Sequence, residues 1–269
     1  MYYIIEEISE YIVYAEMMSD MGGFSFMQRF FVDSSAYNGN VVTISGNDAF
    51  HISRSLRMKK GEMISVCLPD GRLLRCKLDS FSDDEVLAEV VSEEKCRSES
   101  PVKISVYIAL PKGDKLDTVV QKAVECGAYS VTPFVSERCI AKAGDGFDKK
   151  LERLNRIAYE AAKQCGRGIV PEVKSILTYE QMLDEALAAA LPLFCYEADG
   201  TLPLGQLLRR DAKEISVIVG SEGGFSDKEA MLAKEKGLLL TGLGPRILRC
   251  ETAPMFVLSC LSLYYELGI

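Results

Sequence analysis

The sequence has 269 residues and a mass of 29.7 kDa, with 48% hydrophobic and 26% charged residues and a mean hydropathy of +0.07. This composition excludes a disordered, collagen-like or coiled-coil chain, and the length is sufficient for two domains with separate cores. The formal net charge of −8 argues against a strongly basic nucleic-acid binder, and much of it comes from residues 1–26, which contain five acidic and no basic side chains. Any RNA contact must therefore come from local basic clusters.

The cysteine and histidine content argues against a disulfide framework and against a metal site. Nine cysteines are scattered without a Cys-x-x-Cys pair, and His51 is the single histidine. An odd number of dispersed cysteines is typical of free thiols in a reducing compartment. The sequence contains no run of about 18 apolar residues, and its N-terminus lacks the positive region of a signal peptide. We therefore expect a cytoplasmic protein with no metal and no membrane contact.

Changes in composition divide the sequence into three parts. Residues 1–26 end in a Met-Gly-Gly-Phe-Ser break, and we interpret them as an appended extension, non-native or disordered, with an additional helix as the alternative. Residues 27–97 are rich in short β-branched runs and end in a charged, polar stretch. From residue 98 to residue 269 the hydrophobic periodicity is different. The predicted domains are therefore residues 27–97 and 98–269.

The first domain is predicted to be a small β-barrel or sandwich with one helix. Its strand-like runs are separated by turn signals, among them Pro69-Asp70-Gly71, which is typical of a hairpin. We expect a helix over 47–57 and strands over 41–45, 63–68, 73–78 and 86–91.

The second domain is predicted to be an α/β domain with a mostly parallel sheet. Its strand-like runs alternate with helical stretches, which indicates helices on both faces of the sheet. Ligands of such sheets bind at the carboxyl ends of the strands. We expect strands over 102–110, 129–134, 172–176, 192–197, 215–219 and 238–241, and helices over 116–126, 148–165, 178–190, 203–210, 226–236 and 252–267.

A turn with three glycines over 220–224 is the first candidate for a ligand site. It follows the apolar strand over 215–219, and Ser226 with Glu229 then forms a capping box that opens a helix. Glycines let the backbone approach a ligand and expose its N–H groups. The alternative is a tight strand-to-helix connection without a ligand. The glycine spacing matches neither the dinucleotide-binding nor the phosphate-binding motif.

A second candidate is the segment over 240–254, whose loop between the last strand and the last helix contains two glycines, one proline and the pair Arg246 and Arg249. Pro254 suits the first turn of the following helix, with Thr252 as its cap. The arginines alone would fit salt bridges on a solvated face. However, the glycine turn is expected two strands away in the same sheet. We therefore predict that the two segments form one site.

The final helix, over 255–267, is apolar on nearly all sides. Such a pattern predicts burial all round, whereas a terminal helix usually keeps a solvated face. We therefore expect this helix to form the interface of a homodimer.

Several short segments occur in the order seen in one enzyme family. Three of them are Lys112-Gly113-Asp114-Lys115, Ser136-Glu137-Arg138 and Arg246-Ile247-Leu248-Arg249, the last followed by Glu251-Thr252-Ala253. With them, residues 27–269 resemble the bacterial 16S ribosomal RNA (uracil-N3)-methyltransferase family, which belongs to the SPOUT-type trefoil-knot methyltransferases. The other matching segments are Gln121 to Gly127, Glu160 to Arg167 with Pro171, Gly220 to Gly224, Arg29-Phe30-Phe31, and His51 to Arg57 with Gly61.

The resemblance implies a C-terminal knotted α/β domain and a small N-terminal PUA-like β-barrel that binds RNA. It also implies that S-adenosylmethionine binds in a bent form against the glycine turn, the second loop and the end of the strand that precedes them. The residues expected around this cofactor are Leu193, Cys195, Glu197, Gly220, Ser221, Glu222, Gly223, Gly224, Leu243, Gly244, Ile247, Leu248, Arg249, Thr252 and Ala253.

The sequence departs from the family pattern at three positions. Ser221 stands where the family usually has proline, Cys250 where threonine is common, and Ser55 where valine is usual. Loss of the proline removes a locked φ angle, at a cost of about 0.4–1 kcal/mol. We do not expect this change to abolish cofactor binding.

Methylation of uracil at N3 requires loss of a proton and stabilisation of the negative charge that spreads to two carbonyl oxygens. Arg246 or Arg249 can donate hydrogen bonds to those oxygens, and one such donor contributes roughly 3–4 kcal/mol in a dry site. Glu222 and Glu251 are candidates to accept the proton or to orient an arginine, and the sequence leaves their division of labour open. The target base is expected to leave its stack.

Basic residues of both domains are candidates for RNA contacts. Phe30 and Phe31 can stack on bases, although two aromatic residues at the start of a strand are more often core residues. His51 fits an RNA contact and a structural role equally well. The predicted RNA-binding residues are Arg29, His51, Arg54, Arg57, Lys59, Lys60, Lys112, Arg138 and Arg167.

The sequence therefore favours S-adenosylmethionine-dependent methylation of N3 of a specific uridine in 16S ribosomal RNA, in free form or in the small subunit. One alternative is another SPOUT-class RNA methyltransferase with a different target nucleotide or a ribose 2′-OH acceptor. The other alternative is a non-catalytic RNA-binding assembly factor that has lost the cofactor. The intact residues Gly223, Gly224, Arg246, Arg249 and Glu251 argue against this last reading.

Overall fold

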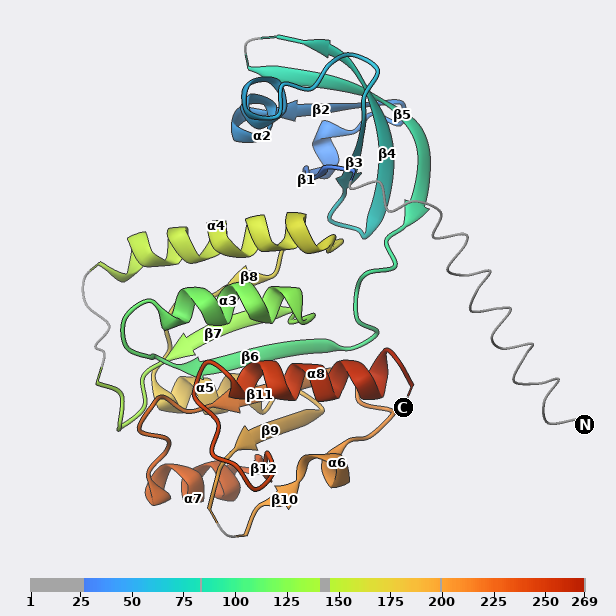
Figure 1. The fold of residues 1–269 in the computed structure, drawn as a ribbon. Helices are drawn as coiled ribbons and strands as arrows, with labels where there is room; N and C mark the ends of the chain where they lie inside the picture. The colour runs from blue at the N-terminus through green and yellow to red at the C-terminus, as the bar shows by residue number, and fades with distance from the viewer. Residues whose placement is uncertain (1–26, 83, 141–145, 199, 269) are drawn as a thin grey trace, which may run out of the picture. The chain divides into compact units, whose positions relative to one another are not determined.

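The computed structural model describes residues 27–82, 84–140, 146–198 and 200–268 (Figure 1). It divides into two compact units. One contains residues 74–93 and everything described before residue 67, and the other contains residues 67–73 and the chain from residue 94 onward. The predicted domain boundary at residue 97 lies close to this division. The segment 1–26, interpreted above as an extension, lies outside the described residues.

The first unit is built on a five-stranded sheet. Its strands are β1 (Arg29–Phe31), β2 (Val41–Ser45), β3 (Met63–Cys67), β4 (Arg72–Phe81) and β5 (Glu85–Lys95). The order is β1-β3-β4-β5-β2, with β2 antiparallel to β5. Alternate residues of β4 (Leu74, Cys76, Leu78) are buried, as expected for a strand with one face on a core. The sheet is a half-barrel with β1 and β2 at its edges, so the closed barrel that the sequence predicts is not seen in the described residues.

The helix predicted over 47–57 is present as two consecutive pieces. These are α2 (Gly46–Phe50) and a π-helical turn η2 (His51–Ser55), which bury Ala49 and Ile52. Arg57 follows with a φ of 53°, in the left-handed region that residues other than glycine rarely adopt. The helix therefore ends earlier than predicted. The short strand β1 contains Phe30 and Phe31, which the sequence analysis places at the start of a strand, whereas the 3₁₀ turn η1 (Ser34–Ala36) was not predicted.

The second unit contains a seven-stranded sheet in which every described strand pair is parallel. Its strands are β6 (Lys103–Ala109), β7 (Ser130–Phe134), β8 (Glu172–Val173), β9 (Leu191–Cys195), β10 (Leu202–Pro203), β11 (Glu214–Val219) and β12 (Leu239–Gly242). The order is β10-β12-β9-β11-β6-β7-β8. Val217 of β11 pairs with Val106 of β6 on one side and with Leu193 of β9 on the other. These central strands are nearly continuous apolar runs because helices cover both of their faces.

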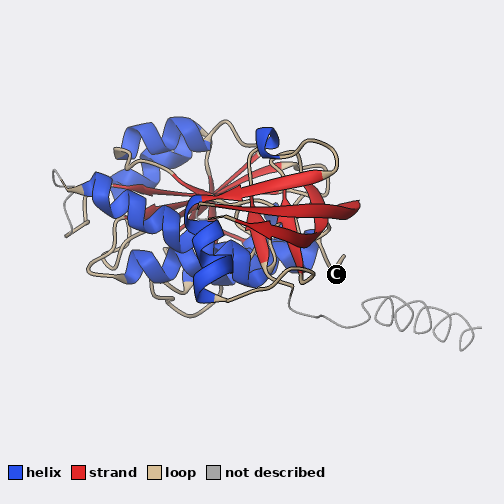
Figure 2. Cartoon of the chain, turned by 90° about the horizontal axis from the view of Figure 1, so that it is seen from above, coloured by secondary structure: helices blue, strands red, loops and turns tan. Residues whose placement is uncertain are grey.

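Helices lie on both faces of this sheet, as the alternating pattern predicts (Figure 2). They are α3 (Lys115–Glu125), α4 (Phe147–Cys165), α5 (Tyr179–Ala186), α6 (Leu204–Leu207), α7 (Asp227–Lys236) and α8 (Ala253–Tyr265). Helices α5 and α7 share one core cluster with Phe134, Phe194 and Phe225. Helix α3 contacts α4 and α8 on the other face. Three predicted elements are clearly shorter than expected. Strand β8 pairs with β7 over two residues only, helix α5 ends at Ala186 and not at residue 190, and α6, which contains Gly205, is a single turn.

Helix α8 is not buried all round in the single chain. Val257 is fully buried, but Phe256 and Leu263 are 37% and 43% exposed. Pro254 lies in the first turn as predicted, whereas Thr252 makes no side-chain capping hydrogen bond because its backbone is already helical. The helix is apolar on nearly all sides because one apolar face packs into the core and a second apolar face is exposed.

The described helices include none that combines the length and the apolar character needed to cross a bilayer. The nine cysteines, all within the described residues, are free thiols.

A buried ion pair holds the segment before β6 against the turn that follows α4. Arg167 is only 4% exposed, and its Nη2 lies 2.7 Å from Oε2 of Glu99. Its Nη1 donates to the carbonyl oxygens of Val124 and Ala128 at 2.8 and 3.0 Å, and the N–H of Gly168 donates to Glu99 Oε1 at 2.7 Å. The prediction that Arg167 contacts RNA is therefore wrong, because the protein itself occupies its guanidinium group.

Replacing this arginine should strongly destabilise the protein. We expect Arg167→Met to lower the free energy of unfolding by about 3–5 kcal/mol, because Glu99 and two carbonyl oxygens lose a buried partner. Urea denaturation measures the effect. The matched control is Arg97→Met, which changes an exposed arginine of the same segment and should stay within about 0.5 kcal/mol. A loss below about 1 kcal/mol for Arg167→Met would contradict the structural role.

Candidate functional site

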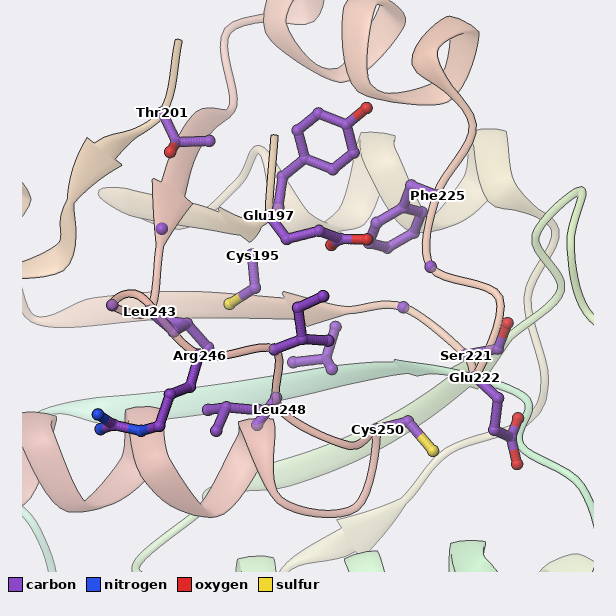
Figure 3. Close-up of a pocket in the computed structure, with 18 residues that line it drawn as sticks. Cys195, Glu197, Thr201, Ser221, Glu222, Phe225, Leu243, Arg246, Leu248 and Cys250 are labelled. Atoms are coloured by element: carbon purple, nitrogen blue, oxygen red, sulfur yellow. The ribbon is translucent and has the colours of Figure 1, made fainter. Parts of the chain in front are cut away.

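A pocket lies at the carboxyl ends of three neighbouring strands, β9, β11 and β12 (Figure 3). It encloses about 790 Å³ of empty space, part of it open to solvent, which is within the size range of small-molecule sites. Its lining residues belong to three segments of the chain. They are residues 195–197 with residue 201, part of 219–225, and part of 242–253. The sheet therefore places this cavity where open α/β sheets bind ligands.

The strand order explains why segments far apart in sequence share this pocket. Strand β9 lies between β11 and β12, so the glycine turn and the second loop are two strands apart, as predicted. Ile218 and Leu240 both pair with Phe194, and Thr241 pairs with Cys195. The three strands therefore end at the same level, and the chain after each of them forms one wall.

The backbone can line the cavity because side chains are absent at three positions. Gly224 has a φ of 64°, and a Cβ there would lie 2.8 Å from Oε1 of Glu197. A Cβ on Gly242 would lie 2.9 Å from Oγ1 of Thr201, and one on Gly220 would lie 3.2 Å from the backbone of Gly224. Side chains at these positions would push the pocket walls apart or fill the space between them.

The exit of the glycine turn is fixed by the predicted capping box, which the structure confirms. Ser226 Oγ accepts from the N–H of Glu229 at 3.3 Å, and the Glu229 carboxylate accepts from the N–H of Ser226 at 2.9 Å. The same carboxylate accepts from the N–H of Glu137 at 2.8 Å. Phe225, the last residue before the capping box, packs into the core, with its ring centroid 4.2 Å from that of Phe194. The turn is thus held on both its polar and its apolar side.

Ser221 carries an unsatisfied hydroxyl in the wall of the pocket. The residue is 7% exposed, and its Oγ has no hydrogen-bond partner among the described residues. Its carbonyl oxygen accepts from the N–H of Gly224 at 2.9 Å, which closes the turn. A buried hydroxyl without a partner costs free energy. A ligand in the pocket can satisfy this group after a change of the serine rotamer.

Charged groups gather at one end of the pocket. Glu222 Oε1 accepts from Nζ of Lys115 at 2.8 Å and from the N–H of Lys112 at 3.2 Å. Oε2 of Glu251 lies 3.7 Å from the same Lys115 Nζ, and the Cys250 thiol donates to Glu251 at 3.2 Å. Burial raises the pKa of Cys250 to about 12, so its thiol stays protonated. Both carboxylates predicted for the site therefore lie beside one ammonium group that the sequence analysis did not include.

The two candidate arginines do not lie together. Arg246 lines the pocket, and Figure 3 places it at the end opposite to Glu222. Arg249 lies outside the lining with its side chain 83% exposed, and its Nη1 is 3.9 Å from Oε1 of Glu251. Arg249, not Arg246, therefore belongs to the charged end of the pocket.

Four residues predicted around the cofactor do not line the cavity. Leu193 is buried inside β9, Gly223 packs against Arg138, and Arg249 and Thr252 are exposed beyond the lining. The predicted residues that do line it are Cys195, Glu197, Gly220, Ser221, Glu222, Gly224, Leu243, Gly244, Ile247, Leu248 and Ala253. Lining residues that the prediction missed are Tyr196, Thr201, Val219, Phe225, Gly242 and Cys250. Most of them are chain neighbours of predicted residues at the strand ends, which is the signal that could have found them.

Two predicted RNA contacts lie next to the pocket. Lys112 and Arg138 are exposed, and Arg138 Nη1 donates to the carbonyl oxygen of Gly223 at 3.2 Å. In the described residues no cluster of three or more histidine, cysteine or acidic side chains could hold a metal ion.

The predicted RNA contacts of the first unit have different exposures. Phe30 is fully buried, which favours its core interpretation. Arg29, Phe31 and His51 are partly buried. Lys60 pairs with Asp79 at 2.8 Å. The predicted cations that are exposed are Arg54, Arg57, Lys59 and Lys60.

Comparison with known proteins decides the family. Residues 98–262 match the model of the RNA methyltransferase domain. This chain belongs to the RNA methyltransferase family. The match covers most of the unit that carries the pocket, including all three pocket walls.

Relatives resemble this methyltransferase over nearly its whole length. The ribosomal RNA small subunit methyltransferase E of Bacillus subtilis (strain 168) is 34% identical over 90% of this chain and 98% of its own. The protein of the same name from Aquifex aeolicus (strain VF5) is 32% identical over 85% and 96%.

Solved structures show the same fold. The Neisseria gonorrhoeae ribosomal RNA small subunit methyltransferase E bound to S-adenosyl methionine has a TM-score of 0.78 and 31% identity, covering 89% of this chain and 98% of its own. A putative methyltransferase from Legionella pneumophila, in complex with the same cofactor, has a TM-score of 0.79 and 29% identity over 88% and 98%.

Removing the unsatisfied hydroxyl should stabilise the methyltransferase when no ligand is bound. We expect Ser221→Ala to raise the free energy of unfolding by about 1 kcal/mol, because a buried polar atom without a partner is deleted. Chemical denaturation measures this change, with the exposed serine variant Ser92→Ala in β5 as the control. A loss of stability in Ser221→Ala would show that the hydroxyl has a partner in the free protein.

Proposed function

We propose that this methyltransferase transfers the methyl group of S-adenosylmethionine to N3 of a uridine in the RNA of the small ribosomal subunit. The observation that carries the proposal is the three-walled pocket at the ends of β9, β11 and β12, with two carboxylates and an arginine at one end. The family membership and the printed names of the relatives support the substrate class. The cofactor in similar solved structures supports the methyl donor.

The residues of the pocket fit this cofactor. Its walls combine exposed backbone at the glycines with apolar side chains such as Phe225 and Leu248, a combination suited to a flat base and a sugar. The unsatisfied hydroxyl of Ser221 offers a hydrogen bond, and the carboxylate of Glu197 lies in the wall near Gly224. When bound, S-adenosylmethionine supplies an electrophilic methyl group on a positively charged sulfur. Carboxylates in and beside the lining favour that charge.

The charged end of the pocket has the groups that N3 methylation requires. The N3–H bond must break, with the proton going to a base and the electron pair staying on nitrogen. That pair forms the bond to the methyl carbon while the carbon–sulfur bond of the donor breaks and its electron pair goes to sulfur. Glu222 lines the pocket and can accept the proton. Arg249 lies beside Glu251 at the same end, where its guanidinium can hydrogen-bond the uracil oxygens as negative charge develops. Arg246, at the opposite end, is assigned to the cofactor.

The proposal also covers the RNA-binding surface, the half-barrel, the path of the chain around the pocket and the oligomeric state. Exposed cations near the pocket, Lys112 and Arg138, extend the binding surface, and the exposed cations of the first unit add sequence-independent phosphate contacts. We further infer a PUA-like RNA-binding role for the five-stranded half-barrel, a knotted path for the chain around the pocket, and a homodimer that covers the exposed face of α8. The apolar side chains Phe256 and Leu263 support the last of these.

Loss of Arg249 should impair the reaction without unfolding the protein. We expect Arg249→Ala to reduce methyl transfer on the order of 100–1000-fold, because a donor to the developing negative charge is lost. Its stability should stay within about 0.5 kcal/mol of the wild type, because the side chain is largely exposed. Transfer of labelled methyl groups to small subunits measures the rate, and Arg156→Ala, an exposed arginine of α4, is the control. Near-normal turnover by Arg249→Ala would remove this residue from the mechanism.

Nucleoside analysis tests the proposed reaction itself. Small subunits from a strain that lacks the gene are incubated with purified protein and S-adenosylmethionine, and the digested RNA is analysed by mass spectrometry. We expect one new N3-methyluridine per subunit. A methyl group on another base atom or on a ribose would favour a different RNA methyltransferase. Binding to subunits without any transfer would favour a non-catalytic assembly factor.

A further inference from the structure

We propose that Lys115 is a positioning residue that holds the Glu222 carboxylate at the mouth of the pocket, in the orientation that accepts the uracil N3 proton. The inference rests on the proposed function and assigns to this lysine a role that neither its sequence position nor its helix suggests. Lys115 does not line the cavity, so it acts through Glu222.

The lysine joins three separate segments of the chain. It is the first residue of α3, after β6, whereas Glu222 follows β11 and Glu251 precedes α8. Its Nζ lies 2.8 Å from Glu222 and 3.7 Å from Glu251. The N–H of Lys112, from the same connection, donates to the same Oε1 of Glu222 at 3.2 Å. One carboxylate oxygen is therefore held by two donors, which leaves the other oxygen for a substrate.

The position of the lysine is unfavourable for the helix alone. Helix N-termini carry a partial positive charge, and a cation in the first turn is destabilising by about 0.3–1 kcal/mol. Asp114, the residue before Lys115, makes no capping hydrogen bond, and Asp117 in the first turn pairs with Arg153 of α4. The two glutamates from other segments supply the negative charge instead. The lysine at this position therefore favours the ionised carboxylates and does not stabilise the helix.

The charged and titratable side chains that face Glu222 come from two other segments. They are Lys115 from α3 and, from the segment before α8, Cys250 and Glu251, with Arg249 beyond Glu251. Burial opposes ionisation of Glu222, but the hydrogen bonds from Lys115 and from backbone N–H groups outweigh it, so the pKa of Glu222 lies below its ordinary value. Hydrogen bonding to Glu222 likewise raises the pKa of Lys115. The pair therefore stays ionised at neutral pH.

This arrangement gives each group one task in the proton transfer. The N3–H bond breaks, its proton moves to the free oxygen of Glu222, and its electron pair remains on N3. Glu222 changes from a carboxylate to a carboxylic acid, and Lys115 keeps its proton throughout. Without the ammonium group the carboxylate can rotate away from the pocket, and protonation from solvent becomes easier.

The test compares Lys115→Met with Lys115→Arg in the full-length protein. For Lys115→Met we expect a decrease in kcat on the order of 10–100-fold with little change in the affinity for S-adenosylmethionine, measured by calorimetry. The acidic limb of the pH profile should move to higher pH, because loss of the cation raises the pKa of Glu222 and the base must be ionised to act. Lys115→Arg, which keeps a cation, should recover most of the activity. Lys122→Met, which removes the lysine paired with Glu125 on the same helix, is the matched control.

Two further measurements separate positioning from a structural role. With Glu222→Gln as the background, adding Lys115→Met should cause no further decrease in kcat, because both changes remove the same function. Carbon NMR titration of labelled glutamate in the cofactor-free protein should show a higher pKa for Glu222 in Lys115→Met. Unchanged kcat, pH limb and Glu222 pKa in Lys115→Met would overturn the inference. If the wild type itself transfers no methyl group, the proposed function fails, and the NMR titration alone then decides whether Lys115 controls Glu222.

Discussion

Parallel pairing of β9 between β11 and β12 is the constraint on which the rest of the site depends. Parallel strands bring the chain out at the same edge of the sheet, so three segments separated by tens of residues become the walls of one pocket. The glycines Gly220, Gly224 and Gly242 let those walls approach one another without filling the cavity. The capping box of α7 and the aromatic core beneath it fix the turn without placing a side chain in the cavity.

Electrostatics divides the pocket into two ends. At one end Lys115 lies between Glu222 and Glu251, with Arg249 at the rim, and at the other end lies Arg246. In the proposed reaction a proton acceptor and a donor to the uracil oxygens face the same edge of one base, and the first end offers both in Glu222 and Arg249. Arg246 lies at the other end of the pocket, which is why we assign it to the cofactor and not to the uracil oxygens.

Much of this organisation could be predicted from the sequence because it is local. The apolar run before the glycine turn, the Ser226 and Glu229 capping box and the strand alternation all depend on neighbours within a few residues. The exceptions depend on long-range contacts. In the sequence Arg167 resembles an RNA-binding arginine, but in the structure it is paired with Glu99, 68 residues earlier. The role inferred for Lys115 likewise depends on its contact with Glu222, 107 residues later. Thr252 failed as a cap because the chain before α8 is already helical, which its residue type does not reveal.

A crystal structure of the protein grown with S-adenosylmethionine tests the central claim most directly. The account predicts electron density for the cofactor between the chain ends of β9, β11 and β12, in contact with the backbone around Gly220 and Leu243. The methyl group should point toward Glu222. Cofactor bound elsewhere on the molecule, or bound in this pocket with its methyl group directed toward Arg246, would contradict the account.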